Sequence, residues 1–131
     1  MASTRSDDRK RIDEHHRRRF ERLVRTALRR LPRGFGHYLD NVAILVADEP
    51  TPEQREAAGI KPGEILFGLY EGIPRSRVGI GGAILPDRIT IFRRPIEAAC
   101  RTEAEMVEEI RRTIIHEVAH LWGFEEEQLP F

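Results

Sequence analysis

EAEMVEEIRRTIIHEVAHLWG, residues 103–123, predicts one long helix around which the rest of the chain must be arranged. Thr102 precedes it and Glu105 follows three residues later, which is the pattern of a capping box, and no helix breaker occurs before Gly123. Large apolar residues recur at helical spacing and form the expected core stripe: Val107, Ile110, Ile114, Val118 and Leu121. A helix with one such stripe needs a partner surface that buries it.

The same helix carries the motif His-Glu-Val-Ala-His at residues 116–120. In a helix, His116 and His120 stand on one face about 6 Å apart along the axis, beside the core stripe. Two neutral imidazoles at this separation can bind one tetrahedral Zn²⁺ ion, and Glu117 beside them can take a proton from a water molecule at the metal. The motif is typical of zinc peptidases. We therefore expect one zinc ion, with Glu117 as the general base.

A hydrolytic zinc site usually has a third protein ligand and leaves the fourth position to water. The eleven residues that follow the motif hold the candidates. Gly123 is placed to turn the chain back toward the metal, because glycine readily adopts positive φ at the end of a helix. Glu126 is the expected ligand, at the spacing of the third ligand in HExxHxxGxxH and HExxHxxGxxD enzymes, and Glu125 and Glu127 are the alternatives.

The segment HEVAHLWGFEEEQL, with DNVAILVADEPTPE, ILFGLYEGIP and LPDRITIFRRPIEAACRTE, resembles the small bacterial zincin-like metallopeptidases, a family long labelled as a domain of unknown function. The resemblance extends from around Phe20 to Leu129. It implies a compact zincin-like fold and peptidase chemistry, but no particular substrate. Members carry Asp more often than Glu at the position of Glu126, so the ligand here would have a longer arm. The methionine turn of larger zincins is absent, because Met1 and Met106 both precede the motif.

The remaining pattern predicts a single α+β domain over residues 1–131. A helix over residues 7–31 shows apolar residues at helical spacing and ends before Pro32, while residues 1–12 are expected to fray. The segment Thr51-Pro52-Glu53-Gln54 predicts a short capped helix. Apolar runs predict strands at residues 42–47, 65–70, 80–85 and 88–93. We expect a compact zincin-like domain in which a small mixed sheet packs against the N-terminal helix and the C-terminal HExxH helix.

We expect a peptide or protein substrate to bind as an extended segment along a sheet edge, as zincins generally do. Residues 88–93 or 80–85 are the candidate edge. Tyr70, at the end of a predicted strand, is a candidate second electrophile for the substrate carbonyl, and a half-buried sheet tyrosine is the alternative. The glycine-rich stretch 72–82 is either a flap beside the cleft or an ordinary surface connection.

Composition agrees with one globular domain, since 131 residues are 40% apolar and 34% charged. No apolar run is long enough to span a bilayer, and the N-terminus lacks the apolar core of a signal peptide, so we expect no membrane partner and a cytoplasmic location. The net charge of zero combines +7 over residues 1–34 with −7 over the remainder. No aromatic interleaving accompanies the N-terminal arginines, so we expect them to face the acidic part of the same chain, or solvent, rather than nucleic acid.

Two other functions compete with that of a zinc peptidase. Metal-dependent ribonucleases of the rRNA-maturation type have three histidines at similar spacing, but glycine follows the first histidine and the third ligand is histidine. This chain has Glu117 and Glu126 at those places, which favours water activation for amide hydrolysis. A non-catalytic binding module that holds zinc for structure is the third possibility, and a fourth protein ligand on the metal would indicate it.

Overall fold

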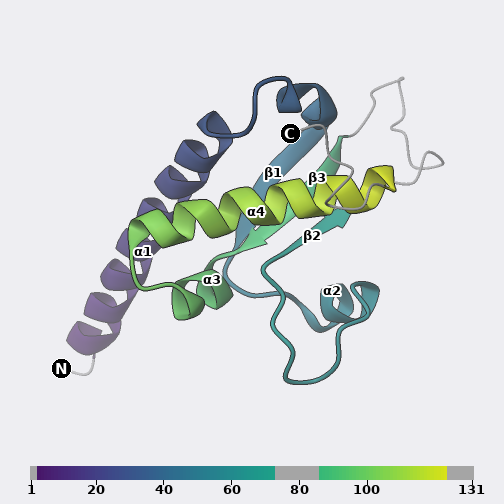
Figure 1. Ribbon diagram of the computed structural model, residues 1–131. Coiled ribbons are helices and arrows are strands. Elements are labelled where there is room, and N and C mark those ends of the chain that lie inside the picture. Colours follow the sequence, from purple (N-terminus) through teal and green to yellow (C-terminus); the bar gives the residue numbers. More distant parts are fainter. Residues whose placement is uncertain (1–2, 73–85, 124–131) are drawn as a thin grey trace, which may run out of the picture.

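Helices and a small sheet form one α+β unit in the computed structural model, which describes residues 3–72 and 86–123 (Figure 1). Helices α1 and α4 share one hydrophobic core with the sheet, as the sequence predicts. The elements follow in the order α1 (Ser3–Arg29), the 3-10 helix η1 (Phe35–Leu39), β1 (Val42–Ala47), α2 (Pro52–Ala57), β2 (Gly68–Glu71), β3 (Asp87–Phe92), α3 (Arg93–Ala99) and α4 (Glu103–Trp122).

The sheet is mixed and has β3 at its centre, in the order β1-β3-β2. Strand β3 runs parallel to β1, with Ile89 opposite Ile44, and antiparallel to β2, with Ile89 opposite Tyr70. The prediction that residues 88–93 form a substrate-binding edge is therefore wrong, because both sides of β3 are already paired. The other candidate edge, residues 80–85, lies outside the described residues.

Strand β2 begins at Gly68, three residues later than the predicted strand 65–70. Its partner β3 ends at Phe92, where α3 takes over, and the N–H of Phe92 donates to the carbonyl of Phe67 at 2.9 Å. Residues 65 and 66 thus lie beyond the end of the partner strand. Ile65 is left 67% exposed, although its apolar side chain suggested a strand interior.

The core lies between one face of the sheet and the two long helices. It contains Phe20 and Val24 from α1, Ile89 and Ile91 from β3, and Ile114 from α4. In the predicted core stripe of α4 the first four members are buried, but Leu121 is 47% exposed. The last turn of α4 therefore carries an apolar side chain that the core does not cover.

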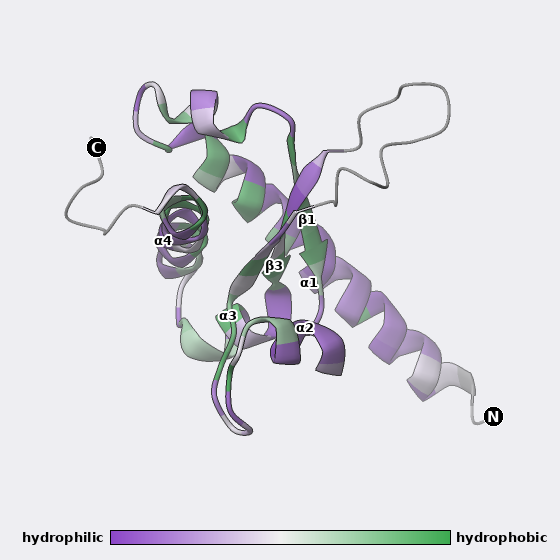
Figure 2. Cartoon of the chain, turned by 90° about the vertical axis from the view of Figure 1, so that its right-hand side faces the viewer, coloured by the Kyte–Doolittle hydropathy of each residue, from purple (hydrophilic) through white to green (hydrophobic). Residues whose placement is uncertain are grey.

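Helix α1 begins at Ser3. Residues 3–12, which the sequence predicts to fray, are therefore helical and continuous with the rest of α1. Figure 2 shows this N-terminal half as largely hydrophilic and projecting away from the sheet. The middle of α1 faces acidic side chains of the same chain, as expected: Arg17 binds Asp48 at 2.8 Å and Arg19 binds Glu97 at 3.2 Å. No helix in the described ranges is long and apolar enough to cross a membrane.

A charge cluster joins α1, the end of β1 and α3. The Arg93 side chain is buried and donates to Asp48 at 3.0 Å, Glu97 at 2.8 Å and Asp13 at 2.8 Å. Arg17 donates to both Asp13 and Asp48. These contacts tie together segments that are far apart in the sequence.

Asp48 makes the free energy of unfolding depend on pH. The hydrogen bond from Arg17 lowers the pKa of Asp48 from 3.8 to about 2, partly opposed by burial and helped by Arg93. A carboxyl whose pKa is lowered on folding stabilises the protein above pH 3.8, and this stabilisation is lost as pH falls toward 2. Since the side chain is 32% exposed, water screens the interaction and we expect no more than about 1–2 kcal/mol.

Urea unfolding followed by circular dichroism at pH 5 and pH 2.5 measures this contribution. Wild type is expected to lose more stability on acidification than Asp48→Asn. The control is Asp8→Asn, at an exposed site of α1. This variant should lose as much stability between pH 5 and pH 2.5 as wild type does. An acid loss in Asp48→Asn as large as that of wild type would contradict the role of Asp48.

Candidate active site

Local signals at both ends fix the span of α4, the helix that carries the motif. The Thr102 hydroxyl accepts from the N–H of Glu105 at 3.1 Å, as the capping pattern predicts. The Glu105 carboxylate accepts from the N–H of Arg101 at 2.8 Å, one residue before the position of a standard capping box. At the other end Gly123 has φ 72°, the left-handed conformation expected of it, and its N–H bonds the carbonyl of His120 at 3.2 Å.

The last turn of α4 rests on η1. The rings of Tyr38 and Trp122 meet edge to face, with centroids 5.3 Å apart and planes at 85°. Tyr38 also contacts Phe35, which is fully buried. An aromatic chain therefore leads from the core to the residue two positions after His120. No local sequence signal indicates this support, because the contact joins residues that are far apart in the chain.

The three motif residues occupy two environments on α4. His116 and His120 are exposed and one helical turn apart, whereas Glu117 is half-buried. Oε2 of Glu117 accepts from the backbone N–H of Tyr70, on β2, at 3.3 Å. This contact directs the carboxylate toward the sheet, where its rotation is restricted.

Burial raises the pKa of Glu117, and the Tyr70 N–H and the nearby imidazoles of His116 and His120 pull it back in part. A carboxylate of raised pKa is a stronger base at neutral pH than an exposed glutamate, which suits a group that has to accept a proton from water.

A groove of about 310 Å³ lies between α4 and the strand β2. Its α4 wall carries Thr113, His116 and Glu117, and its opposite wall carries Phe67 and Gly68. The face of α4 that carries His116 opens on this groove. The structure thus places the candidate base and one candidate metal ligand beside β2, which is an edge strand of the sheet within the described residues, and the sequence alone did not indicate which strand that is.

Gly68 sets the width of the groove. A Cβ atom on this residue would lie 2.6 Å from Cγ2 of Thr113 and 3.1 Å from the backbone oxygen of Thr90. Only a residue without a side chain lets β2 approach α4 this closely. The signal was in the sequence, since a glycine inside a predicted strand often marks the close approach of another segment.

Gly68→Ala is expected to destabilise the protein by about 1–3 kcal/mol, the usual range for an overpacked site. Thr113→Ser removes the methyl group that the new Cβ would meet and should recover much of this loss in the double variant. Thermal and urea unfolding of the two single variants and the double variant measure the coupling. Gly36→Ala is the matched control, because nothing lies within 4 Å of its Cβ. If Gly68→Ala lowers the stability equally with and without Thr113→Ser, position 68 does not lie close to the methyl group of Thr113.

Tyr70 contributes its backbone N–H to Glu117, while its phenol points elsewhere. The hydroxyl donates to Oδ2 of Asp87 on β3 at 2.7 Å. Burial, and then this bond to Asp87, raise the pKa of Tyr70. The geometry is that of a half-buried sheet tyrosine, the alternative to a second electrophile.

The described residues supply two donors for a metal. His116 and His120 are the borderline-soft nitrogen ligands that zinc prefers, exposed on one side of a rigid helix, and this donor set fits the ion. No third His, Cys, Asp or Glu joins them within residues 3–72 and 86–123. The expected third ligand, Glu126, and its alternatives Glu125 and Glu127 lie outside the described residues.

Comparison with known protein families places the chain. No curated protein matches it. The family model of the zincin-like metallopeptidases matches residues 39–130, which include the three described strands and the whole of α4, while α1 precedes the matched region. Because the match covers well over half of the sequence, and includes the helix on which the HExxH motif lies, the chain belongs to the zincin-like metallopeptidase family.

Proposed function

We propose that the protein is a zinc-dependent peptidase that binds one zinc ion through His116, His120 and Glu126. The observation that carries the proposal is the position of Glu117. Its carboxylate accepts from the backbone N–H of Tyr70 on β2, and it lines a solvent-open groove that His116 also lines. A zinc ion in such a site supplies Lewis acidity, which lowers the pKa of a water molecule toward neutrality and polarises the carbonyl of the scissile bond.

Glu117 is the group that moves the proton. Its carboxylate accepts the proton of the attacking water and then delivers it to the nitrogen of the departing amine. The Tyr70 N–H keeps Oε2 at the groove during this transfer. The half-buried site limits competing water around the carboxylate and makes it more basic.

Strand β2 is the edge along which an extended peptide would lie. Among the described strands it pairs with β3 alone. Since the N–H of Tyr70 reaches Glu117, it points away from β3, and by the alternation of an antiparallel ladder the N–H of Gly68 does the same. A substrate strand would add to β2 on this side, at the outward-facing N–H of Gly68, with its scissile bond near Glu117.

The test is cleavage of a mixed peptide library by the zinc-loaded protein, with the chelated protein and a structured RNA in parallel. Peptide cleavage that depends on zinc supports the proposal. Cleavage of RNA alone would instead assign the ribonuclease chemistry, for which the exposed arginines of α1 are the motivating feature. If neither substrate is cleaved at full zinc loading, both enzymatic functions are wrong, and the protein is a non-catalytic binding module.

A further inference from the structure

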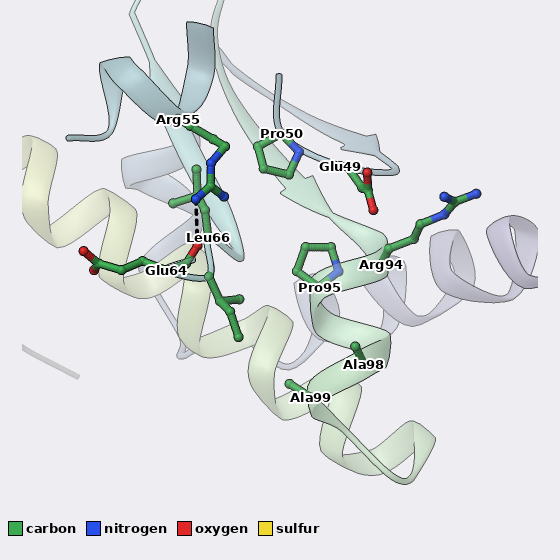
Figure 3. A pocket seen from close by; sticks show the side chains of 10 residues that line it. Glu49, Pro50, Arg55, Glu64, Leu66, Arg94, Pro95, Ala98 and Ala99 are labelled. Carbon is green, nitrogen blue, oxygen red and sulfur yellow. Dashed lines mark hydrogen bonds between the residues drawn. The ribbon is translucent and has the colours of Figure 1, made fainter. Parts of the chain in front are cut away.

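A second and larger cavity, of about 550 Å³, opens on the other side of residues 64–66 (Figure 3). It lies between the segment that follows β1 and helix α3. Its lining is mainly apolar: Pro50, Leu66, Pro95, Ala98 and Ala99. A volume of this size is within the range of pockets that bind ligands rather than single water molecules.

The two arginines at this cavity are engaged by the protein itself. Arg55 donates to the backbone carbonyls of Lys61 at 3.2 Å and Glu64 at 2.9 Å, and Figure 3 shows the guanidinium turned to the latter. Arg94 lies 3.6 Å from Asp13 of α1. Glu49 and Glu64 also line the cavity, but most of its surface is apolar. Exposed Ile65 adds to this surface at the cavity wall.

The cavity adjoins the active-site groove. Leu66 lines both. The groove and the cavity thus meet at this side chain.

We propose that this cavity is a distal subsite that takes a large apolar side chain, such as Leu, Phe or Trp, of the peptide held in the groove. The inference rests on the proposed peptidase function. From Glu117 to Glu109, at the far end of the groove, the helix rises about 12 Å, a length that an extended peptide covers in about four residues. The preferred apolar residue is therefore about four positions from the cleaved bond.

The decisive variant is Ala98→Trp, which fills the cavity from an exposed position of α3, and its control is Ala104→Trp, at an exposed alanine of α4 outside both cavities. In library cleavage, wild type and Ala104→Trp should favour peptides with a large apolar residue at that distance by about tenfold or more in kcat/KM, the effect of burying one such side chain. Ala98→Trp should lose this preference because KM for the peptides with the large apolar residue rises, while kcat stays unchanged. Ile65→Ser should weaken the preference without adding bulk.

Binding separates the subsite from the chemistry. Fluorescence anisotropy of labelled peptides with Leu or Ser at the distal position, measured with Glu117→Gln, needs no turnover. Tighter binding of the Leu peptide that Ala98→Trp abolishes supports the subsite. Cleavage by wild type without a distal preference would overturn the subsite and leave the peptidase intact. Absence of all cleavage would overturn the peptidase, and equal binding of the two peptides would then overturn the subsite as well.

Discussion

Glu117→Gln is expected to lower kcat for peptide cleavage by about 10²–10⁴-fold, the range that a general acid–base group contributes. Glutamine has the size of glutamate, and its amide oxygen can still accept from the Tyr70 N–H, so the geometry of the groove should persist. What disappears is the basic oxygen that takes a proton from water. Zinc content should be unchanged, because the metal is held by other side chains.

The measurement is kcat on a peptide selected from the library, with zinc content and circular dichroism determined on the same samples. Glu108→Gln is the control, since Glu108 is an exposed residue of the same helix and pairs with Arg111 at 3.3 Å. It should retain wild-type turnover. Turnover within threefold of wild type in Glu117→Gln, at equal zinc content, would show that another group is the base.

Arg93→Met is expected to lower the free energy of unfolding by about 3–5 kcal/mol, the usual result of removing one partner from a buried ion pair. Arg93 is 2% exposed and donates to three carboxylates, those of Asp13, Asp48 and Glu97. Methionine has a similar length but no charge, so the variant leaves these acids with less compensation. The acids keep some access to water, which favours the lower part of the range.

Urea unfolding at pH 7 measures this loss. The control is Arg94→Met, one residue further along, where the side chain is 51% exposed and its nearest acid, Asp13, lies at 3.6 Å. An exposed pair of this kind contributes about 0–1 kcal/mol. If Arg93→Met and Arg94→Met have equal free energies of unfolding, the buried cluster does not stabilise the fold. Since α1 precedes the family-matched residues 39–130, the same cluster also helps to attach this helix to the family domain, together with its core side chains.

Local sequence signals predicted the elements that carry the candidate site. The threonine at 102 and the glycine at 123 set the ends of α4, and the box formed by Thr51 and Gln54 caps α2 as predicted. Each of these signals acts over one helical turn, through hydrogen bonds between neighbours in the sequence. For that reason His116 and His120 were expected on one exposed face before any tertiary contact was known.

The order of the strands was beyond such signals. The sequence leaves residues 88–93 as a candidate edge, whereas β3 is central in the described sheet. Its pairing with β1 and β2 depends on contacts between distant segments, which local patterns do not show. The prediction that Leu121 belongs to the core stripe is wrong. Its helical spacing is correct, but the core ends before it.

The groove also depended on tertiary structure. Gly68 was the one residue whose type already signalled a close approach, while the contribution of Tyr70 comes from its backbone and leaves no trace in the side-chain pattern. The role of Glu126 stays a prediction from spacing.

Anomalous diffraction at the zinc edge, on crystals grown from the zinc-loaded protein, tests the central claim most directly. We predict one zinc ion bonded to a nitrogen of His116 and a nitrogen of His120 at about 2.0–2.1 Å, with Glu126 as the third protein ligand and a fourth position open to solvent. Absence of an ion between the two imidazoles, or a fourth protein ligand that closes the site, would contradict the proposal.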